Sequence, residues 1–390
     1  LAIDALLGIG QLRTPTERLA EHLARLQNST APVLCVDLPS GLDADHGQHL
    51  LGPCQRPLPG ARHTLSLLTL KPGLFTADGR DQAGTVWFDD LGVFAPPEVP
   101  PSALLHGTTS DRARPHAAHK GSHGDVVVVG GQDISVNGAG MTGATVLAAR
   151  AALHTGAGRV YLCSLGADEA ASPSAWDPGC PELMFRRWAS LRDSELLEHA
   201  CVVCGCGGGD AVSAVLPETL QRARSLVLDA DGLNAIAAHP ALQDALSQRA
   251  IRGQTTVLTP HPLEAARLLG SSTAAVMADR LAAAHALSER FGCVCVLKGS
   301  GTVVCAPGET PRINASGNAA LATAGTGDVL AGFIGAALAA PGTGASALRR
   351  VADAVYHHGW LADRWVSETT ASGSRAPLTA DALARSARAG

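Results

Sequence analysis

Gly325, Thr326, Gly327 and Asp328 form a glycine-rich turn that carries a carboxylate and runs directly into an apolar, helix-competent segment at 329–338. Such a turn leaves backbone N–H groups unpaired at a helix N-terminus, where the helix dipole also favours an anion such as phosphate. A carboxylate repels that anion, so its presence is explained best if Asp328 takes a proton from a hydroxyl that attacks a phosphoryl group. The structural alternative is an acidic residue that only stabilises the helix.

Further glycine or polar clusters lie at the ends of apolar runs, at residues 120–124, 130–131, 205–209, 229–234, 259–264 and 298–302. Each cluster alone is explained by an ordinary turn. Their succession at strand ends indicates one shared site, because ligands of doubly wound α/β domains bind at the carboxyl ends of the strands.

The composition is that of a two-domain α/β protein, with 390 residues of which 17% are charged and 46% hydrophobic. Because the net charge is −5, no broad basic surface is expected to bind nucleic acid or an anionic membrane. No apolar run reaches the roughly 18–20 residues of a membrane span. We expect a cytoplasmic homo-oligomer.

The ten cysteines lie mostly in apolar contexts, which is typical of a reducing compartment. Cys201, Cys204 and Cys206 have the spacing of metal ligands, but no second Cys or His pair follows at zinc-site spacing. Buried strand residues are therefore predicted.

The hydrophobic pattern predicts a front domain at 1–95, a proline-rich linker at 96–114, a back domain at 115–367 and a tail at 368–390. Because the chain opens as a strand that enters a glycine turn, we expect the natural N-terminus to lie upstream. The predicted strands are 1–5, 33–37, 63–68, 85–88, 125–129, 159–163, 200–204, 225–229, 255–259, 293–298 and 302–305. The predicted helices are 15–27, 143–155, 211–224, 263–269, 275–290, 328–340 and 345–367.

Residues 115–367 resemble the ADP-dependent NAD(P)H-hydrate dehydratase family, a branch of the ribokinase-like fold. The resemblance rests on the ordered stretches at 119–124, 141–144, 151–158, 229–234, 259–264, 297–299 and 324–332. The family's usual Gly-Pro-Gly-Leu-Gly stands here as Gly-Cys-Gly-Gly-Gly at 205–209.

This resemblance implies a catalytic Asp328 that removes the proton of the hydrate hydroxyl as it attacks the β-phosphate of ADP. The implied substrates are NADH hydrate and NADPH hydrate, with ADP as co-substrate, Mg²⁺ as cofactor, and AMP and phosphate as products. The implied hydrate contacts are Ala144, Gly209, His261 and Asp328. The implied nucleotide contacts are Lys298, Gly299, Ser300, Gly301, Thr302 and Gly327. The implied anion hole consists of Ala324, Gly325, Thr326 and Gly327.

The front domain resembles the back part of the NAD(P)H-hydrate epimerase family, through the stretches at 4–13 and 36–45. The family's Asn-Asn-Gly-Gly-Asp-Gly segment, expected upstream, is absent, so we expect a partial Rossmann-like α/β domain whose epimerase activity the sequence leaves open. By resemblance, Asp4 and Ser40 bind potassium. The implied substrate contacts are Gly8, Ile9, Gly10, Gln11, Leu12, Arg13 and Asp37.

Two other functions stay open at this point. A ribokinase-like kinase of a small alcohol or vitamin precursor would use the same Asp328 chemistry but release a stable phosphate ester. A non-catalytic nucleotide-binding protein is the alternative from another class. Preference between NADH and NADPH hydrates, and between ADP and ATP, is not visible in the residues.

Overall fold

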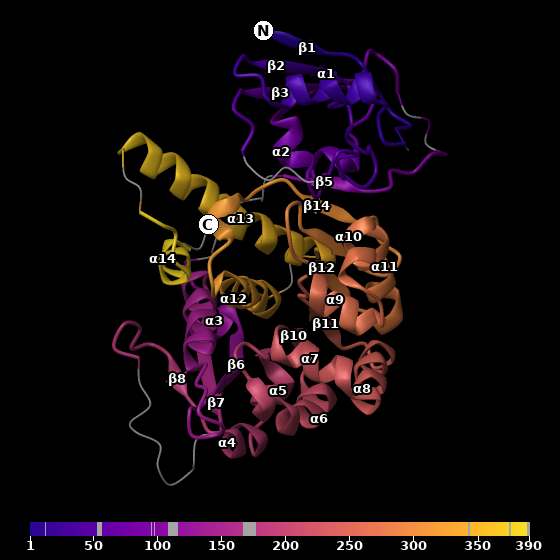
Figure 1. The fold of residues 1–390 in the computed structure, drawn as a ribbon. Coiled ribbons are helices and arrows are strands. Elements are labelled where there is room, and N and C mark those ends of the chain that lie inside the picture. Colours follow the sequence, from indigo (N-terminus) through magenta and orange to yellow (C-terminus); the bar gives the residue numbers. More distant parts are fainter. Residues whose placement is uncertain are drawn as a thin grey trace.

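The computed structural model describes residues 1–11, 13–52, 57–94, 96, 98–107, 116–166, 177–341, 344–373 and 376–387. Two α/β units follow one another along the chain, and the smaller, N-terminal unit lies at the top of Figure 1. The fold is therefore a small parallel α/β sheet followed by a larger doubly wound domain.

The front sheet contains four parallel strands in the order β1-β2-β3-β4 within the described residues. Its elements are β1 (Ala2–Asp4), α1 (Glu17–Gln27), β2 (Val33–Val36), β3 (Arg62–Leu67), the 3-10 helix η1 (Pro72–Leu74), α2 (Gly79–Ala83) and β4 (Thr85–Asp89). Alternate residues of β3 are buried, as expected of a strand with one covered face. The four strands match the strands predicted from the sequence.

The back domain is built on a mixed sheet that has ten strands in the described part of the chain, in the order β5-β14-β13-β12-β11-β10-β9-β6-β7-β8. Its strands are β5 (Leu104–His106), β6 (Asp125–Gln132), β7 (Arg159–Leu165), β8 (Met184–Phe185), β9 (Cys201–Cys204), β10 (Ser225–Leu228), β11 (Thr255–Leu258), β12 (Val294–Leu297), β13 (Val303–Cys305) and β14 (Arg312–Asn314). Strand β13 runs antiparallel to both of its neighbours, whereas the other pairings are parallel.

Helices cover both faces of this sheet. They are α3 (Thr142–His154), α4 (Trp188–Arg192), α5 (Leu196–His199), α6 (Val212–Arg222), α7 (Asp231–Ala238), α8 (Pro240–Ile251), α9 (Pro262–Leu269), α10 (Thr273–Ala278), α11 (Arg280–Phe291), α12 (Thr326–Ala339), α13 (Ala347–Ala371) and α14 (Ala380–Ser386). The 3-10 helices are η2 (Lys120–His123), η3 (Gly209–Ala211) and η4 (Ala319–Leu321).

Two hydrophobic cores lie against the two faces of the sheet. Val126 and Val128 of β6 pack into one core with α3, α12, α13 and α14, which gather on one side of the sheet in Figure 1. Val127 and Val129 point into the other core, which is completed by residues of α6, α7, α8, α9 and α11. The unbroken valine run is explained by this double coverage, because successive strand side chains face opposite sides.

The strand order reverses between β6 and β9. From β6 the chain moves to β7 on one side and then returns to β9 on the other. Such a switch point opens a crevice at the carboxyl ends of the two strands, where doubly wound domains bind ligands. The glycine clusters at 130–131 and 205–209 both lie there.

Several boundaries differ from the expectations. The helix expected over 275–290 is two helices, because Asp279 leaves helical geometry and its side chain caps α11 through the N–H of Ala282 at 2.8 Å. Within the range expected to be linker, residues 104–106 form β5, which adds to the edge of β14. In the range expected to be a tail, α14 packs on α3, and its Asp381 accepts a hydrogen bond from Arg150 at 2.5 Å.

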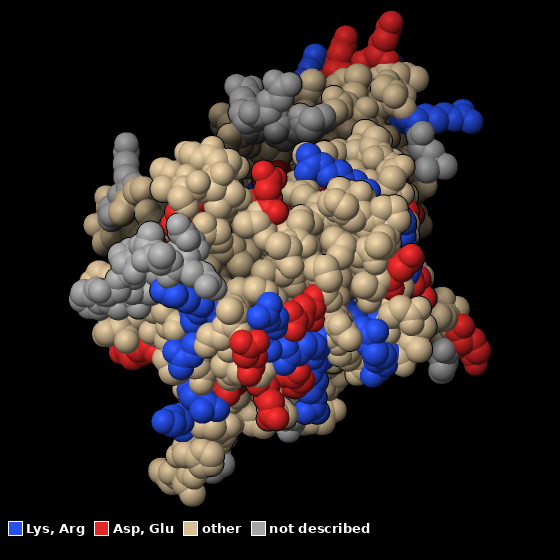
Figure 2. Space-filling view, turned by 90° about the horizontal axis from the view of Figure 1, so that it is seen from below, with Lys and Arg blue, Asp and Glu red and all other residues tan. Residues whose placement is uncertain are grey.

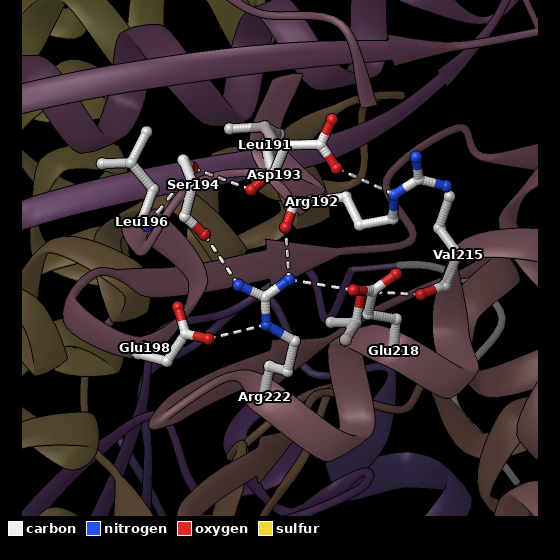
Figure 3. Close-up of polar contacts among 10 residues, drawn as sticks. Leu191, Arg192, Asp193, Ser194, Leu196, Glu198, Val215, Glu218 and Arg222 are labelled. Atoms are coloured by element: carbon white, nitrogen blue, oxygen red, sulfur yellow. Dashed lines mark hydrogen bonds and ion pairs between the residues drawn. The ribbon is translucent and has the colours of Figure 1, made fainter. Parts of the chain in front are cut away.

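A charge cluster around Arg222 fastens α6 to the segment before β9 (Figure 3). Its guanidinium pairs with Glu198 at 2.6 Å and Glu218 at 2.8 Å, and donates to the carbonyl oxygens of Arg192 and Ser194. These residues precede β9 or lie in the last turns of α6, so they lie near the amino end of β9, whereas the switch point lies at its carboxyl end. Their role is to hold the fold together.

In the view of Figure 2, basic and acidic side chains are interleaved on the lower part of the face.

No helix within the described ranges is long and apolar enough to cross a membrane. The nine cysteines that the structure describes are all buried and outside disulfides. Cys201 and Cys204 are buried strand residues of β9, as predicted, whereas Cys206 is buried but lies after the strand.

Candidate active site

Asp328 is the third residue of α12. The residue that precedes the helix is Gly325, whose backbone is left-handed with φ 90°. Helix α12 packs against α3 and against β9 and β10, so its N-terminal turn meets the loops that follow these strands. A Cβ added at Gly327 would lie 3.5 Å from Lys298 Nζ and 4.0 Å from Asp229 Oδ2. The glycine therefore lets the helix terminus approach both charged groups closely.

Asp229, which is buried, and Lys298, which is partly buried, form an ion pair in the site. Lys298 Nζ donates to Asp229 Oδ1 at 2.7 Å, and the hydroxyl of Thr259 donates to the same oxygen at 2.8 Å. Burial alone lowers the pKa of the Lys298 ammonium, but the carboxylates of Asp229 and Glu264 outweigh it, so the pKa is raised. Lys298 is thus a fixed cation beside Asp328.

The environment of Asp328 suits a general base. Burial, reinforced by the negative charge of Asp229, raises the pKa of the Asp328 carboxyl to about 6. A base is most effective when its pKa lies near the working pH, where it is ionised yet still basic. Asp328 is therefore ionised at neutral pH and a stronger base than an exposed aspartate.

A buried thiol also faces this carboxylate. Cys206 follows β9, and its Sγ lies in a group with carboxylate oxygens of Asp229 and Asp328 in which all three atoms are within 4.8 Å of one another. Its hydrogen bond to Asp328 lowers the pKa of that carboxyl, against the opposing effect of burial. The loop that contains Cys206 is held in place by two hydrogen bonds. Gly131 N–H and the Thr145 hydroxyl donate to the Cys206 carbonyl at 2.9 and 3.1 Å.

Ala144 and Gly209, two of the predicted hydrate contacts, lie on either side of this loop. A Cβ added at Gly207 would lie 2.9 Å from the Ala144 Cβ, so α3 begins against the loop. Gly209 has φ 51°, and its N–H donates to Asp231 at 2.9 Å. A side chain there would collide with Gln132, the last residue of β6.

His261 caps α9 and is partly exposed. The imidazole Nδ1 accepts from the N–H of Leu263 at 3.1 Å, while the backbone N–H of His261 donates to the Glu264 carboxylate at 2.8 Å. Burial lowers the pKa of the imidazole, so a neutral ring is favoured. Burial raises the pKa of Glu264 to about 7. The structure thus gives His261 a structural role beside the predicted substrate contact.

The loop at 298–302 joins the antiparallel strands β12 and β13. It is held from behind by the buried Arg280 of α11, which donates to the carbonyl oxygens of Ser300, Leu297 and Lys298. Gly299 and Ser300 are exposed, whereas Gly301 is buried with φ 62°. Thr302 donates through its hydroxyl to the carbonyl of Gly299 at 3.1 Å. The loop therefore offers exposed backbone beside Lys298.

The predicted anion hole is the first turn of α12. The first N–H groups of a helix lack intrahelical partners, and among them Thr326 N–H makes a long contact to Thr323 O at 3.4 Å. Gly327 and Asp328 thus present their amides at the helix terminus, next to Gly325, while Ala324 is exposed.

His358 of α13 holds the first turn of α12 by a hydrogen bond. Its Nε2 lies 3.0 Å from the Thr326 carbonyl oxygen. Burial lowers the pKa of His358 to about 4, so the neutral ring donates that hydrogen bond at physiological pH.

The predicted potassium ligands of the front domain lie together. Asp4 accepts from the Ser40 N–H at 2.8 Å and from its hydroxyl at 2.5 Å, and both residues are buried. The Ser40 hydroxyl oxygen also accepts the N–H of Leu7 at 2.9 Å. Asp4 and Ser40 line a small cavity against α1 that His49 and Arg62 share.

The expected substrate loop of the front domain connects β1 to α1. Gly8, Ile9, Gly10 and Arg13 are exposed, and Gln11 accepts the N–H of Gly41 at 2.5 Å. Leu12 lies outside the described residues.

Asp37 completes the front site from the end of β2. It has φ 69° and pairs with Lys71, a residue that the sequence analysis did not select.

Other residues of the site were also missed by the sequence analysis. They are Cys206, Arg280, His358 and the Asp229–Lys298 pairing. Cys206 was examined as a metal ligand and assigned to a strand, and only its position directly after a strand within a glycine run could have indicated the site.

The chain is similar to several known proteins. A family model described as NAD(P)H-hydrate dehydratase matches residues 126–385, and one described as YjeF-related protein N-terminus matches residues 1–73. The chain is 36% identical over 350 residues to the bifunctional NAD(P)H-hydrate repair enzyme Nnr of Escherichia coli strain K12. The aligned region covers 87% of this chain but only 62% of that protein. It is 40% identical over 280 residues to the ADP-dependent (S)-NAD(P)H-hydrate dehydratase of Neisseria meningitidis, covering 71% of this chain and 88% of that protein.

Solved structures share the fold of the back domain. The ADP/ATP-dependent NAD(P)H-hydrate dehydratase of Bacillus subtilis, co-crystallised with ATP and Mg²⁺, superposes with a TM-score of 0.56 at 28% identity, over 73% of this chain and 92% of that chain. A ribokinase-like superfamily protein of Enterococcus faecalis gives a TM-score of 0.54 at 22% identity, over 73% of this chain and 89% of its own.

Proposed function

The chain belongs to the bifunctional NAD(P)H-hydrate repair enzyme family, and on that premise we propose that its back domain dehydrates the S form of NADH hydrate and NADPH hydrate with ADP as co-substrate. The observation that carries the proposal is the placement of Asp328, whose pKa is raised to about 6, at a helix N-terminus beside Lys298. This arrangement joins a base to a phosphate-binding turn.

The reaction begins when Asp328 accepts the proton of the hydrate hydroxyl. The hydroxyl oxygen attacks the β-phosphorus of ADP, and AMP leaves. The amides of Gly327 and Asp328, together with Lys298, stabilise the charge on the transferring phosphoryl group, as preorganised donors do. The resulting ester loses phosphate with assistance from the ring nitrogen lone pair, and loss of a proton from the adjacent ring carbon then restores the double bond of the dihydronicotinamide. Ala144, Gly209 and His261 are proposed to orient the hydrate, and residues 298–302 the nucleotide.

Mg²⁺ is proposed to accompany the nucleotide. Mg²⁺ takes one or two carboxylates beside substrate phosphates, and Asp229 supplies such a carboxylate next to Asp328. Because Asp229 Oδ1 is engaged by Lys298 and Thr259, Oδ2 is the oxygen left to face α12. When bound, the ion neutralises charge on the phosphates.

The front domain is proposed to interconvert the R and S hydrates. Asp4, Ser40 and the Leu7 carbonyl form an all-oxygen donor set, which suits a hard cation such as K⁺. Asp37 and residues 8–13 are proposed to contact the substrate.

The test is to incubate the purified chain with prepared hydrate and either ADP or ATP. We expect the absorbance of the reduced nicotinamide to return only when nucleotide is present, with AMP and phosphate formed in equal amounts from ADP. A kinase would instead accumulate a stable phosphate ester. A non-catalytic nucleotide-binding protein would bind ADP and restore no absorbance.

A prediction about pH follows from Cys206. Because Asp328 must be ionised to accept a proton, kcat should fall as the pH drops below about 6. Removing the thiol in Cys206→Ala removes a hydrogen bond that lowers the pKa of Asp328, so the acid limb of the kcat profile should move to higher pH. Cys206→Ser keeps a donor and is the matched control. Identical profiles in all three proteins would show that the thiol does not act on the base.

A further inference from the structure

Front-domain residues reach across to the back domain at the nucleotide loop. The contacting residues are His46, Gln48, Phe75, Thr76 and Arg80, of which Arg80 lies in α2. They touch the back domain at residues 277–279, at Gly301 and at 315–317. Gly301 belongs to the loop at 298–302, and the other two places adjoin residues that contact this loop, Arg280 and Asn314.

The first contact lies at the start of α11. Gln48 Nε2 donates to the Met277 carbonyl at 2.9 Å, and His46 Nε2 lies 3.5 Å from the Asp279 carboxylate. Asp279 caps the helix whose first residue, Arg280, holds the backbone of the nucleotide loop. A contact at 277–279 therefore lies next to the residue that holds this loop.

The second contact is made by the loop itself. A Cβ built on Gly301 would lie 1.8 Å from the Phe75 carbonyl oxygen and 3.0 Å from the Thr76 Cα. The front-domain backbone thus lies directly against the buried face of the nucleotide loop, and only a glycine leaves room for it.

The third contact is made by the guanidinium of Arg80 in α2. It donates to three successive carbonyl oxygens, those of Ala315 at 3.4 Å, Ser316 at 3.2 Å and Gly317 at 2.8 Å. This segment leads from β14 to η4 and so to the turn that carries Asp328. Its other side is fixed by α13, because Gly317 N–H donates to Asp363 at 2.8 Å.

We propose that the front domain positions the nucleotide site of the back domain and that Arg80 is the positioning residue that couples the two. The proposal rests on the nucleotide site assigned above. A planar guanidinium with several fixed donors is suited to hold three carbonyl groups at once, whereas a side-chain amide has only two N–H donors. By linkage, ADP binding should in turn tighten the contact between the domains.

The test measures ADP affinity by calorimetry without hydrate, using the full chain. Arg80→Gln should raise the Kd for ADP by about five- to tenfold, within the usual range of coupling between sites, with little change in Tm and an unchanged KM for the hydrate. Arg25→Gln, at an exposed position of α1, is the matched control and should bind ADP like the parent chain.

Equal ADP affinity in the Arg80 variant and the control would overturn the proposal, as would a loss of Tm without a change in Kd. If Arg80→Gln does not fold, Gln48→Ala replaces it, with a higher Kd supporting the coupling and an unchanged Kd contradicting it. Since binding is measured without turnover, a chain that binds ADP but does not dehydrate would refute the proposed function and leave this inference standing.

Discussion

Asp328→Asn should lose about 10²- to 10⁴-fold in kcat, the range that a general base contributes, while still binding ADP. The amide keeps the shape of the side chain but does not accept the hydroxyl proton. It also removes a negative charge from the neighbourhood of the phosphates, so the affinity for ADP should stay the same or rise. Steady-state rates with hydrate and ADP, together with calorimetric ADP binding, measure both effects.

The same variant should be at least as stable as the parent chain above pH 6. In the folded protein Asp328 holds its proton more tightly than in the unfolded chain, because burial raises its pKa to about 6. Its contribution to stability is therefore present at low pH and is lost as the pH rises through that value.

Asp210→Asn, at an exposed carboxylate in η3, is the matched control and should keep full activity. Near-normal turnover in Asp328→Asn would exclude it as the base.

Lys298→Met should be the most destabilising single change in the site. It leaves the carboxylate of Asp229, which is 2% exposed, without its cation, and breaking a buried ion pair costs about 3–5 kcal/mol of unfolding free energy. The remaining hydrogen bond from Thr259 favours the lower end of that range. Denaturant unfolding of the variant measures the loss.

Lys298→Met should also weaken ADP binding, since the only cation beside Gly327 within the described part of the site is removed. The acid limb of kcat should move to higher pH, because Lys298 lowers the pKa of Asp328. Lys120→Met, at an exposed lysine, provides the control. Unfolding curves that coincide for the two variants would show that the Asp229 pair contributes nothing to stability.

The central part of the fold was predictable because its signals are local. The valine run at 126–129 specifies a strand covered on both faces, and the glycine turn before Asp328 marks a helix start. The polar clusters at successive strand ends therefore fell on one edge of the sheet once the strands were placed in parallel. This is why Asp328 was selected without knowledge of contacts, whereas Gly209 and His261 were named as hydrate contacts through the family resemblance.

The remaining features depend on contacts between distant segments. Asp229 and Lys298 are 69 positions apart, so their pairing at 2.7 Å is set by the order of β10, β11 and β12. The break at Asp279 depends on capping within an alanine-rich stretch whose helix propensity is continuous. The short strand β5 exists because β14 offers it an edge. Arg80 gains its partners only when the two domains meet.

The proposed dehydration requires transfer of a phosphoryl group to the hydrate hydroxyl, and isotope tracing tests this step most directly. Hydrate that carries ¹⁸O in its hydroxyl group should be incubated with the protein and ADP in ordinary water, and the released phosphate analysed by mass. If Asp328 activates that hydroxyl for attack on the β-phosphorus, one ¹⁸O atom should appear in each phosphate formed. Phosphate without the label, with the ¹⁸O recovered in water while the reduced nicotinamide returns, would contradict the account.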